Sequence, residues 1–137
     1  MSRKRTPEGL AVNSRVLVIE DHPMDRELVV ELVEQEGYAV LEADSAEVGL
    51  GLAFAERPAL ILMDLQLPRM SGFEAIRRLR GDPTTAHIPI LALTASVVGA
   101  GIRKAGEAGA DACLVKPLDT SNFRETLHRL LTASAAA

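Results

Sequence analysis

Residues 59–72 have the sequence Ala-Leu-Ile-Leu-Met-Asp-Leu-Gln-Leu-Pro-Arg-Met-Ser-Gly, which decides the fold class of the chain. Its apolar run, Leu60–Met63, is short, which is typical of a strand buried on both faces of a sheet. The run ends in the carboxylate of Asp64, and Pro68 and Gly72 then break the chain into a loop. Open α/β sheets bind ligands at the carboxyl ends of their strands, so Asp64 is a candidate functional residue.

The rest of the chain alternates between short apolar runs and amphipathic segments. Strands are expected at Val16–Ile19, Tyr38–Ala43, Leu60–Asp64, Ile88–Leu93 and Ala112–Val115. Helices are expected at Met24–Glu36, from the cap Ser45 to before Pro58, at Phe73–Arg80, within Ser96–Gly109, and from a cap at Asp119 or Thr120 to about Leu131. Five such alternations predict an α/β fold, in which a parallel five-stranded sheet carries helices on both faces.

One of these segments is a poor helix former. Gly99, Gly101 and Gly106 fall inside residues 96–109, and each costs about 1 kcal/mol of helix stability relative to alanine. We therefore expect the helix in this segment to be short or mobile.

The length of 137 residues fits one domain and leaves little room for a second. Residues 1–14 are polar and basic, and we expect a disordered arm there. Residues 15–132 are expected to form the domain, and the Ala-Ser-Ala-Ala-Ala at 133–137 is expected to fray. Because no sequence for an output module follows, we expect a single-domain protein that works without one.

Composition argues against several classes of function. The net charge of -4, the aromatic share of 3% and the absence of Trp argue against nucleic-acid binding. No stretch reaches the roughly 18 apolar residues of a membrane span, and no signal peptide is visible. The single cysteine, Cys113, excludes an internal disulfide and fits a reducing compartment. We expect a cytoplasmic protein that contacts neither nucleic acid nor membrane.

Polar residues at the carboxyl ends of the expected strands would meet at one edge of the sheet. They are Glu20, Asp21, Asp64, Thr94 and Lys116. Three carboxylates in one site repel one another and need a cation, and ligands that are all oxygen favour Mg²⁺. A carboxylate can also act as a nucleophile and form an aspartyl-phosphate, while a lysine and a threonine can bind phosphoryl oxygens. The set is sufficient for the Mg²⁺-assisted phosphorylation of one aspartate.

Several motifs make the chain resemble the receiver (phosphoacceptor) domain of two-component response regulators, over nearly its whole length. These motifs are Glu20-Asp21, Leu62-Met63-Asp64-Leu65-Gln66-Leu67-Pro68, Met70-Ser71-Gly72, Pro89-Ile90-Leu91-Ala92-Leu93-Thr94-Ala95, Ala108-Gly109-Ala110-Asp111 and Lys116-Pro117. Together, at these spacings, they are highly specific. The resemblance implies a doubly wound, flavodoxin-like receiver fold with five strands in the order 2-1-3-4-5. It also implies a role in two-component signal transduction.

The resemblance assigns the phosphoacceptor and the metal ligands. Asp64 would accept a phosphoryl group from the phosphohistidine of a histidine kinase or a histidine phosphotransfer protein. Glu20 and Asp21 would hold Mg²⁺ together with Asp64, Glu20 either directly or through water, and the backbone carbonyl of Gln66 would be a further ligand. His22 lies beside the acids, and we expect a loop residue outside the chemistry, because a hard oxygen site does not need it.

The resemblance also assigns residues around the phosphoryl group. Thr94 and Lys116 would bind the phosphoryl oxygens, and a cis peptide before Pro117 would aim the lysine inward. Ala95 and Ser96 follow the threonine and are further candidate site residues. In the family, the positions of Ser96 and of the glutamine two residues after the phosphoacceptor tune the phosphate lifetime, although both side chains could simply be solvated.

One position departs from the family pattern. Phosphorylation in the family rotates an aromatic residue, three positions before the lysine, and reshapes the face made by the fourth helix, the fifth strand and the fifth helix. Here that position is Cys113, which is too small to report such a rotation. Either the segment 96–109 carries the switch or the switch is weakened. We hypothesise that this segment becomes ordered on phosphorylation and that a downstream protein docks on this face.

Two other functions stay open. A phosphatase with an aspartate nucleophile usually needs a second acid two residues later, and Asp64 is followed there by Gln66. A degenerate receiver would dock to a partner without phosphorylation, which the missing aromatic at Cys113 favours weakly. We expect a monomeric or weakly dimeric signalling protein and not an enzyme. At most it would gain phosphate slowly from small donors and lose it slowly by itself.

Overall fold

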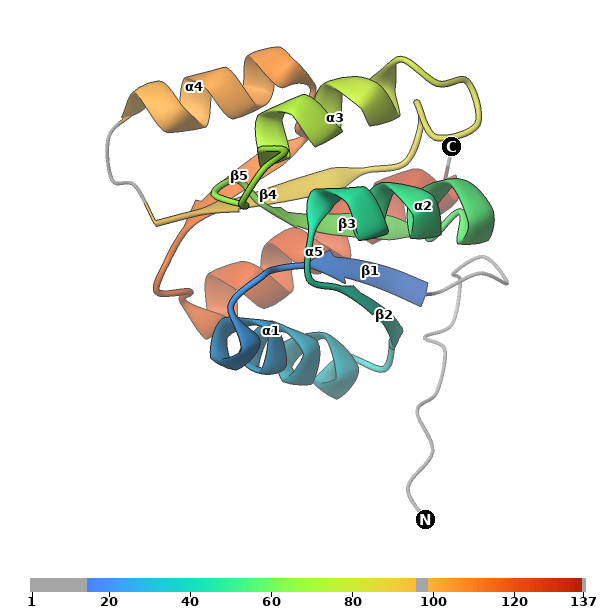
Figure 1. Cartoon of the computed structure of the whole chain (residues 1–137). Coiled ribbons are helices and arrows are strands. Elements are labelled where there is room, and N and C mark those ends of the chain that lie inside the picture. Colours follow the sequence, from blue (N-terminus) through green and yellow to red (C-terminus); the bar gives the residue numbers. More distant parts are fainter. Residues whose placement is uncertain (1–14, 96–98, 137) are drawn as a thin grey trace.

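Five parallel strands form one sheet in the order β2-β1-β3-β4-β5, with helices on both sides (Figure 1). The computed structural model describes residues 15–95 and 99–136, so the predicted arm at 1–14 and Ser96 lie outside the described residues. The strands are β1 (Arg15–Ile19), β2 (Ala39–Ala43), β3 (Leu60–Asp64), β4 (Ile90–Thr94) and β5 (Ala112–Val115). The helices are α1 (Pro23–Gln35), α2 (Ala46–Glu56), α3 (Gly72–Arg80), α4 (Gly99–Ala108) and α5 (Thr120–Ala136). The predicted α/β fold and its strand order are confirmed.

The helices form one layer on each face of the sheet (Figure 1). α1 and α5 cover one face, where Val29 and Phe123 share a core with Leu62 of β3. α2, α3 and α4 cover the other face, where Ile76 shares a core with Met63. Leu62 and Met63 are consecutive and lie in opposite cores because side chains alternate along a strand. All five residues of β3 are buried, as its apolar run predicts.

β4 begins later than predicted. The expected strand started at Ile88, whereas the observed strand starts at Ile90. Pro89 has no N–H group to donate to a neighbouring strand, although its carbonyl still accepts the amide of Ile61 over 3.0 Å. The proline therefore delays regular pairing without separating the two strands.

Of the last two helices, α4 lies within its predicted segment and α5 differs from its predicted bounds. α4 spans Gly99–Ala108 and ends before Gly109, which has the positive φ of 124° that favours glycine. α5 continues to Ala136 and does not end near Leu131, so the helix extends into residues 133–136, and the fraying expected there stays a prediction. Alanine has the highest helix propensity, which accounts for the longer helix. None of the described helices combines the length and the apolar character needed to cross a membrane.

A close backbone contact at Gly72 holds the loop after β3 against the strand. A Cβ atom added at Gly72 would lie 2.5 Å from the carbonyl oxygen of Asp64 and 2.7 Å from the Cα atom of Leu65. The amide of Gly72 donates to the carbonyl of Leu65 over 3.2 Å, and Ser71 caps α3 by accepting the amide of Glu74. The turn that presents Asp64 therefore requires a residue without a side chain at this point.

Gly72→Ala is expected to destabilise the fold, because the added methyl group would force backbone atoms apart. Overpacking of this kind costs about 1–3 kcal/mol and would lower the urea midpoint of unfolding. Gly51→Ala is the matched control, since Gly51 lies inside α2 with no atom within 4 Å of an added Cβ. Helix propensity predicts that the control gains about 0.5–1 kcal/mol. Equal midpoints for the two variants would contradict the tight contact.

Candidate functional site

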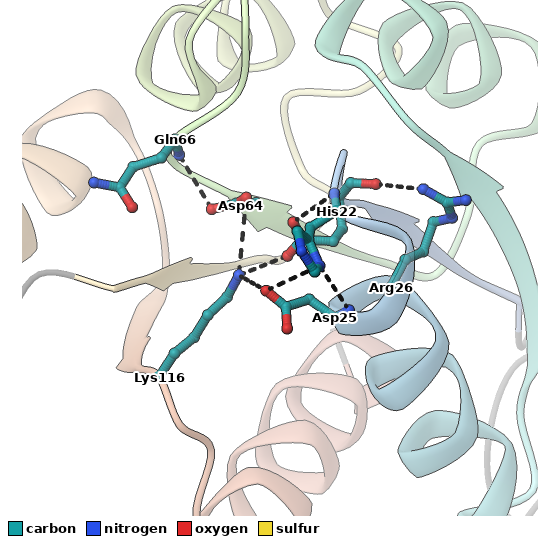
Figure 2. Close-up of polar contacts among 7 residues, drawn as sticks. His22, Asp25, Arg26, Asp64, Gln66 and Lys116 are labelled. Atoms are coloured by element: carbon teal, nitrogen blue, oxygen red, sulfur yellow. Dashed lines mark hydrogen bonds and ion pairs between the residues drawn. The ribbon is translucent and has the colours of Figure 1, made fainter.

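The carboxyl-end edge of the sheet brings Glu20, Asp64 and Lys116 together. The ammonium of Lys116 lies 2.6 Å from Oε1 of Glu20 and 3.8 Å from Oδ2 of Asp64. Figure 2 shows the side chain of Lys116, which directly follows β5, extending toward Asp64. Both acids are buried, with 1% of Glu20 and 4% of Asp64 exposed. Two buried carboxylates therefore share one ammonium.

The register of the strands explains why the two buried acids meet. β1 and β3 pair with Ile19 beside Met63, so Glu20 and Asp64 follow as neighbours at the ends of the two strands. Both acids continue the alternation of residues that faces α1 and α5. Their carboxylates are thus placed on the same side of the sheet by the backbone itself.

Asp21 completes a group of three carboxylates that could hold a metal ion. One oxygen each of Glu20, Asp21 and Asp64 lies within 4.8 Å of the others. Asp21 is exposed to solvent, whereas the other two acids are buried. Ligands that are all oxygen suit a hard divalent cation, and one ammonium balances the three negative charges only in part. The residues present therefore fit the predicted Mg²⁺.

Gln66 acts on the site through its backbone. Its amide donates to Oδ1 of Asp64 over 3.1 Å, and its side chain points away from the acids in Figure 2. This bond orients the carboxylate so that Oδ2 is the oxygen nearer to Lys116. The role of the Gln66 carbonyl as a metal ligand stays a prediction.

Burial controls the proton affinity of these groups. It is the main cause that raises the pKa of Asp64 to about 7; a hydrogen bond with Glu20 adds to this, while the amide of Gln66 and the charge of Lys116 oppose it. Burial alone would lower the pKa of Lys116, but the hydrogen bond with Glu20 and the charges of the nearby carboxylates raise it overall. Lys116 therefore stays charged at neutral pH, whereas Asp64 is partly protonated there.

Thr94 is the last residue of β4 and is buried, with 2% of its surface exposed. Its carbonyl accepts the amide of Lys116 over 2.7 Å, which ties the lysine to the end of the neighbouring strand. Ala95 follows and is exposed, and the Lys116–Pro117 peptide is cis, as the resemblance implies. The binding of phosphoryl oxygens by Thr94 and Lys116 stays a prediction.

The first turn of α1 adds Asp25 and Arg26 beside the site, which the sequence analysis did not name, and His22 precedes this turn (Figure 2). Oδ2 of Asp25 lies 3.4 Å from the ammonium of Lys116. Arg26 donates to the backbone carbonyl of Glu20 over 2.9 Å. His22, which was expected to be a plain loop residue, caps α1 by accepting the amide of Asp25 over 3.4 Å. The position of Asp25 and Arg26 in the sequence could have indicated this, because the first turn of a helix lies beside the end of the strand that precedes it.

Cys113 is partly buried on the face of the sheet covered by α2, α3 and α4. In the β4–β5 pair it lies beside Ala92. Burial raises the pKa of its thiol, so the thiol is neutral at neutral pH and weakly reactive. These features fit a small packing residue better than a redox sensor.

Comparison with known sequences gives a clear family match. The family model described as the response regulator receiver domain matches residues 16–128. The polar-differentiation response regulator DivK of Brucella anthropi is 34% identical over 116 residues, which cover 85% of this chain and 94% of DivK.

Solved structures show the same architecture. The chemotaxis protein CheY4 of Vibrio cholerae has a TM-score of 0.81 at 29% identity, and the match covers 88% of this chain and 100% of CheY4. The receiver domain of a sensor histidine kinase from Pseudomonas aeruginosa has a TM-score of 0.81 at 27% identity, with 88% of this chain and 98% of that domain covered. That structure carries a magnesium ion coordinated in its active-site cleft.

Asp64→Asn is expected to stabilise the fold when no divalent cation is added, and to do so more at high pH. A carboxyl with a raised pKa keeps its proton in the folded state while the unfolded state has lost it, so stability falls as the pH rises from about 4 to about 7. Asparagine does not titrate, so the variant escapes this loss.

Urea unfolding in a chelating buffer measures this effect. The advantage of the Asp64→Asn variant over wild type should grow by about 1–3 kcal/mol between pH values near 5 and near 8. Glu31→Gln, at an exposed position of α1, controls for the removal of one negative charge. A difference that does not change with pH would show that the pKa of Asp64 is not raised.

Proposed function

The chain belongs to the response regulator receiver domain family, and on this basis we propose that Asp64 accepts a phosphoryl group from a phosphohistidine donor in a Mg²⁺-dependent reaction. Receiver domains are signalling proteins and not conventional enzymes, so the product is the phosphorylated protein itself. The observation that carries the proposal is the buried carboxylate of Asp64, which lies between the ammonium of Lys116 and the amide of Gln66 within a group of three acids.

The transfer would join a carboxylate oxygen of Asp64 to phosphorus and break the phosphorus–nitrogen bond of the donor. The bonding electron pair would leave with the imidazole nitrogen of the donor histidine. The nucleophile has to be the ionised carboxylate, and the charge of Lys116 favours that form. Lys116 and the hydroxyl of Thr94 are the candidate groups for binding the phosphoryl oxygens, whose charge must be neutralised in the transition state.

Glu20, Asp21 and Asp64 would hold Mg²⁺, with the carbonyl of Gln66 as a further ligand. When bound, the ion supplies positive charge that offsets both the acids and the phosphoryl oxygens. Neighbouring carboxylates disfavour joint ionisation unless a cation compensates them, and Glu20 adds in this way to the pKa of Asp64, which is raised mainly by burial. The magnesium ion in the Pseudomonas aeruginosa receiver domain supports the assignment.

A phosphorylation-independent docking module is the second candidate function. The observation that favours it is Cys113, because a small, partly buried thiol cannot act as the rotating aromatic of the family. An aspartate-nucleophile phosphatase has less support. Gln66, at the position where that chemistry needs an acid, is an amide whose side chain points away from Asp64 (Figure 2).

The donor would be a histidine kinase or a histidine phosphotransfer protein, and a downstream protein would dock on the face formed by α4, β5 and α5. In the described part of this face, Ile102 of α4 is 40% exposed, which an apolar partner surface could cover. Lys104 of the same helix lies 5.2 Å from the centre of the Phe73 ring, so α4 is also anchored to α3. The cytoplasmic location and the monomeric or weakly dimeric state stay predictions.

Incubation with acetyl phosphate and Mg²⁺ is expected to add one phosphoryl group to the wild-type chain. Intact mass spectrometry measures the adduct, and prior chelation of Mg²⁺ should prevent it. Asp64→Asn should give no adduct, because an amide oxygen is a poor nucleophile.

An adduct of equal size on Asp64→Asn would place the phosphoryl group elsewhere and contradict the proposal. If wild type gains no adduct from acetyl phosphate or from a purified phosphohistidine donor and does not bind Mg²⁺, the docking module becomes the better description. Steady turnover of an aryl phosphate would instead indicate a phosphatase.

Phosphorylation is expected to slow amide hydrogen exchange in residues 96–109, as the hypothesis of an ordering switch requires. Exchange would be compared with and without a beryllofluoride adduct that mimics the phosphoryl group. α3 is the internal control, since the contact at Gly72 already fixes its start. Unchanged exchange in 99–108 would rule out ordering of α4 as the switch.

A further inference from the structure

We propose that Asp25 is a positioning residue that anchors Lys116 outside the three acids of the metal group, so that Glu20 can exchange the lysine for Mg²⁺. The inference rests on the proposed function and adds a residue from the first turn of α1 to its machinery. Its basis is a fourth carboxylate, that of Asp25, which contacts the Lys116 ammonium and does not belong to the metal group (Figure 2).

Lys116 and a divalent cation would compete for the same carboxylate. The shortest ion pair of Lys116 is with Glu20, at 2.6 Å, and Glu20 is one of the three acids whose oxygens lie within 4.8 Å of one another. The other acid of that group near the ammonium is Asp64, at 3.8 Å. Binding of Mg²⁺ to both acids would therefore remove two of the carboxylates that hold the ammonium and would also repel it.

Asp25 offers the ammonium a partner that the metal does not need. Its Oδ2 already lies 3.4 Å from the Lys116 nitrogen, and Asp25 does not belong to the group of three acids. Among the described residues, the ion pairs of Lys116 are with Glu20, Asp25 and Asp64, so only Asp25 would be left to it. A short shift from Glu20 to Asp25 would keep the ammonium paired and inside the site.

The position of Asp25 is fixed by the start of α1. Its amide donates to the ring of His22, the capping residue, over 3.4 Å. The next residue, Arg26, donates to the backbone carbonyl of Glu20 over 2.9 Å and so ties this turn to the end of β1. The side chain of Asp25 is 47% exposed and that of Lys116 is 19% exposed, so the pair can form without the cost of burying two charges.

A Mg²⁺ titration tests the proposal without relying on phosphorylation. The backbone amide of Gln66 donates to Asp64, so its NMR signal reports occupation of the acid group. Asp25→Asn should weaken the apparent Mg²⁺ affinity about three- to fivefold, the range for loss of a partly exposed ion pair. Glu31→Gln removes an equal charge at an exposed position farther along α1 and should change the affinity by less than about twofold, because exposed charges about a Debye length apart are largely screened.

A double-mutant cycle separates positioning of the lysine from a general loss of charge. In a Lys116→Met background, Asp25→Asn should change the Mg²⁺ affinity by less than about twofold, because the residue through which Asp25 acts is gone. If Lys116→Met does not fold, Asp25→Glu decides the question. That variant keeps the carboxylate and should restore at least half of the affinity lost in Asp25→Asn.

Three results would overturn the inference: an effect of Asp25→Asn no larger than that of Glu31→Gln, the same effect in the Lys116→Met background, or no rescue by glutamate. In each case wild type would still bind Mg²⁺ and gain its phosphoryl adduct, so the proposed function would stand. If wild type shows neither Mg²⁺ binding nor an adduct, the proposed function fails and the role of Asp25 fails with it.

Discussion

The site depends on the electrostatic conflict between Glu20 and Asp64, two buried carboxylates that strand register forces to be neighbours. Neither acid can turn away, because each follows directly from a buried strand. Lys116 relieves the conflict in part, with its ammonium 2.6 Å from Glu20, and the neighbouring Glu20 adds to the burial that raises the pKa of Asp64 to about 7. One ammonium does not balance the negative charge of the site once Asp21 is included. A site with this excess of negative charge is suited to binding a divalent cation, or a phosphoryl group together with such a cation.

Much of the fold and of the site was accessible from the sequence, because both depend on short-range patterns. Apolar runs of strand length mark the central strands, and the residue after each run is fixed at the carboxyl edge by topology alone. Lys116 and Glu20 are 96 positions apart, yet their meeting could be inferred since the ends of parallel strands share one edge. The family motifs then gave each residue a role that geometry alone cannot assign.

The details that were missed have two kinds of cause, one in the tertiary structure and one in local chemistry. Asp25 contacts Lys116 only because the first turn of α1 is rotated to face the site, and periodicity does not set that rotation. The delayed start of β4 follows from one missing donor at Pro89, and the long α5 from the helix propensity of the terminal alanines. Pro89 and the terminal alanines are visible in the sequence, so attention to them would have corrected these two bounds.

The contact at Gly72 makes the two sides of the phosphoacceptor mechanically unequal. On the side of α3 the loop backbone at Gly72 lies so close to β3 that even a methyl group would not fit. The loop therefore cannot move closer to Asp64. On the side of β4 the contacts include hydrogen bonds, from the amide of Leu65 to the carbonyl of Leu93 over 2.9 Å and from the amide of Lys116 to the carbonyl of Thr94 over 2.7 Å. A strain produced at Asp64 would therefore move the β4 side more readily than the α3 side, because hydrogen bonds tolerate small shifts better than backbone atoms already in close contact. The rigid loop at Gly72 would therefore determine which side of the sheet responds to a change at Asp64.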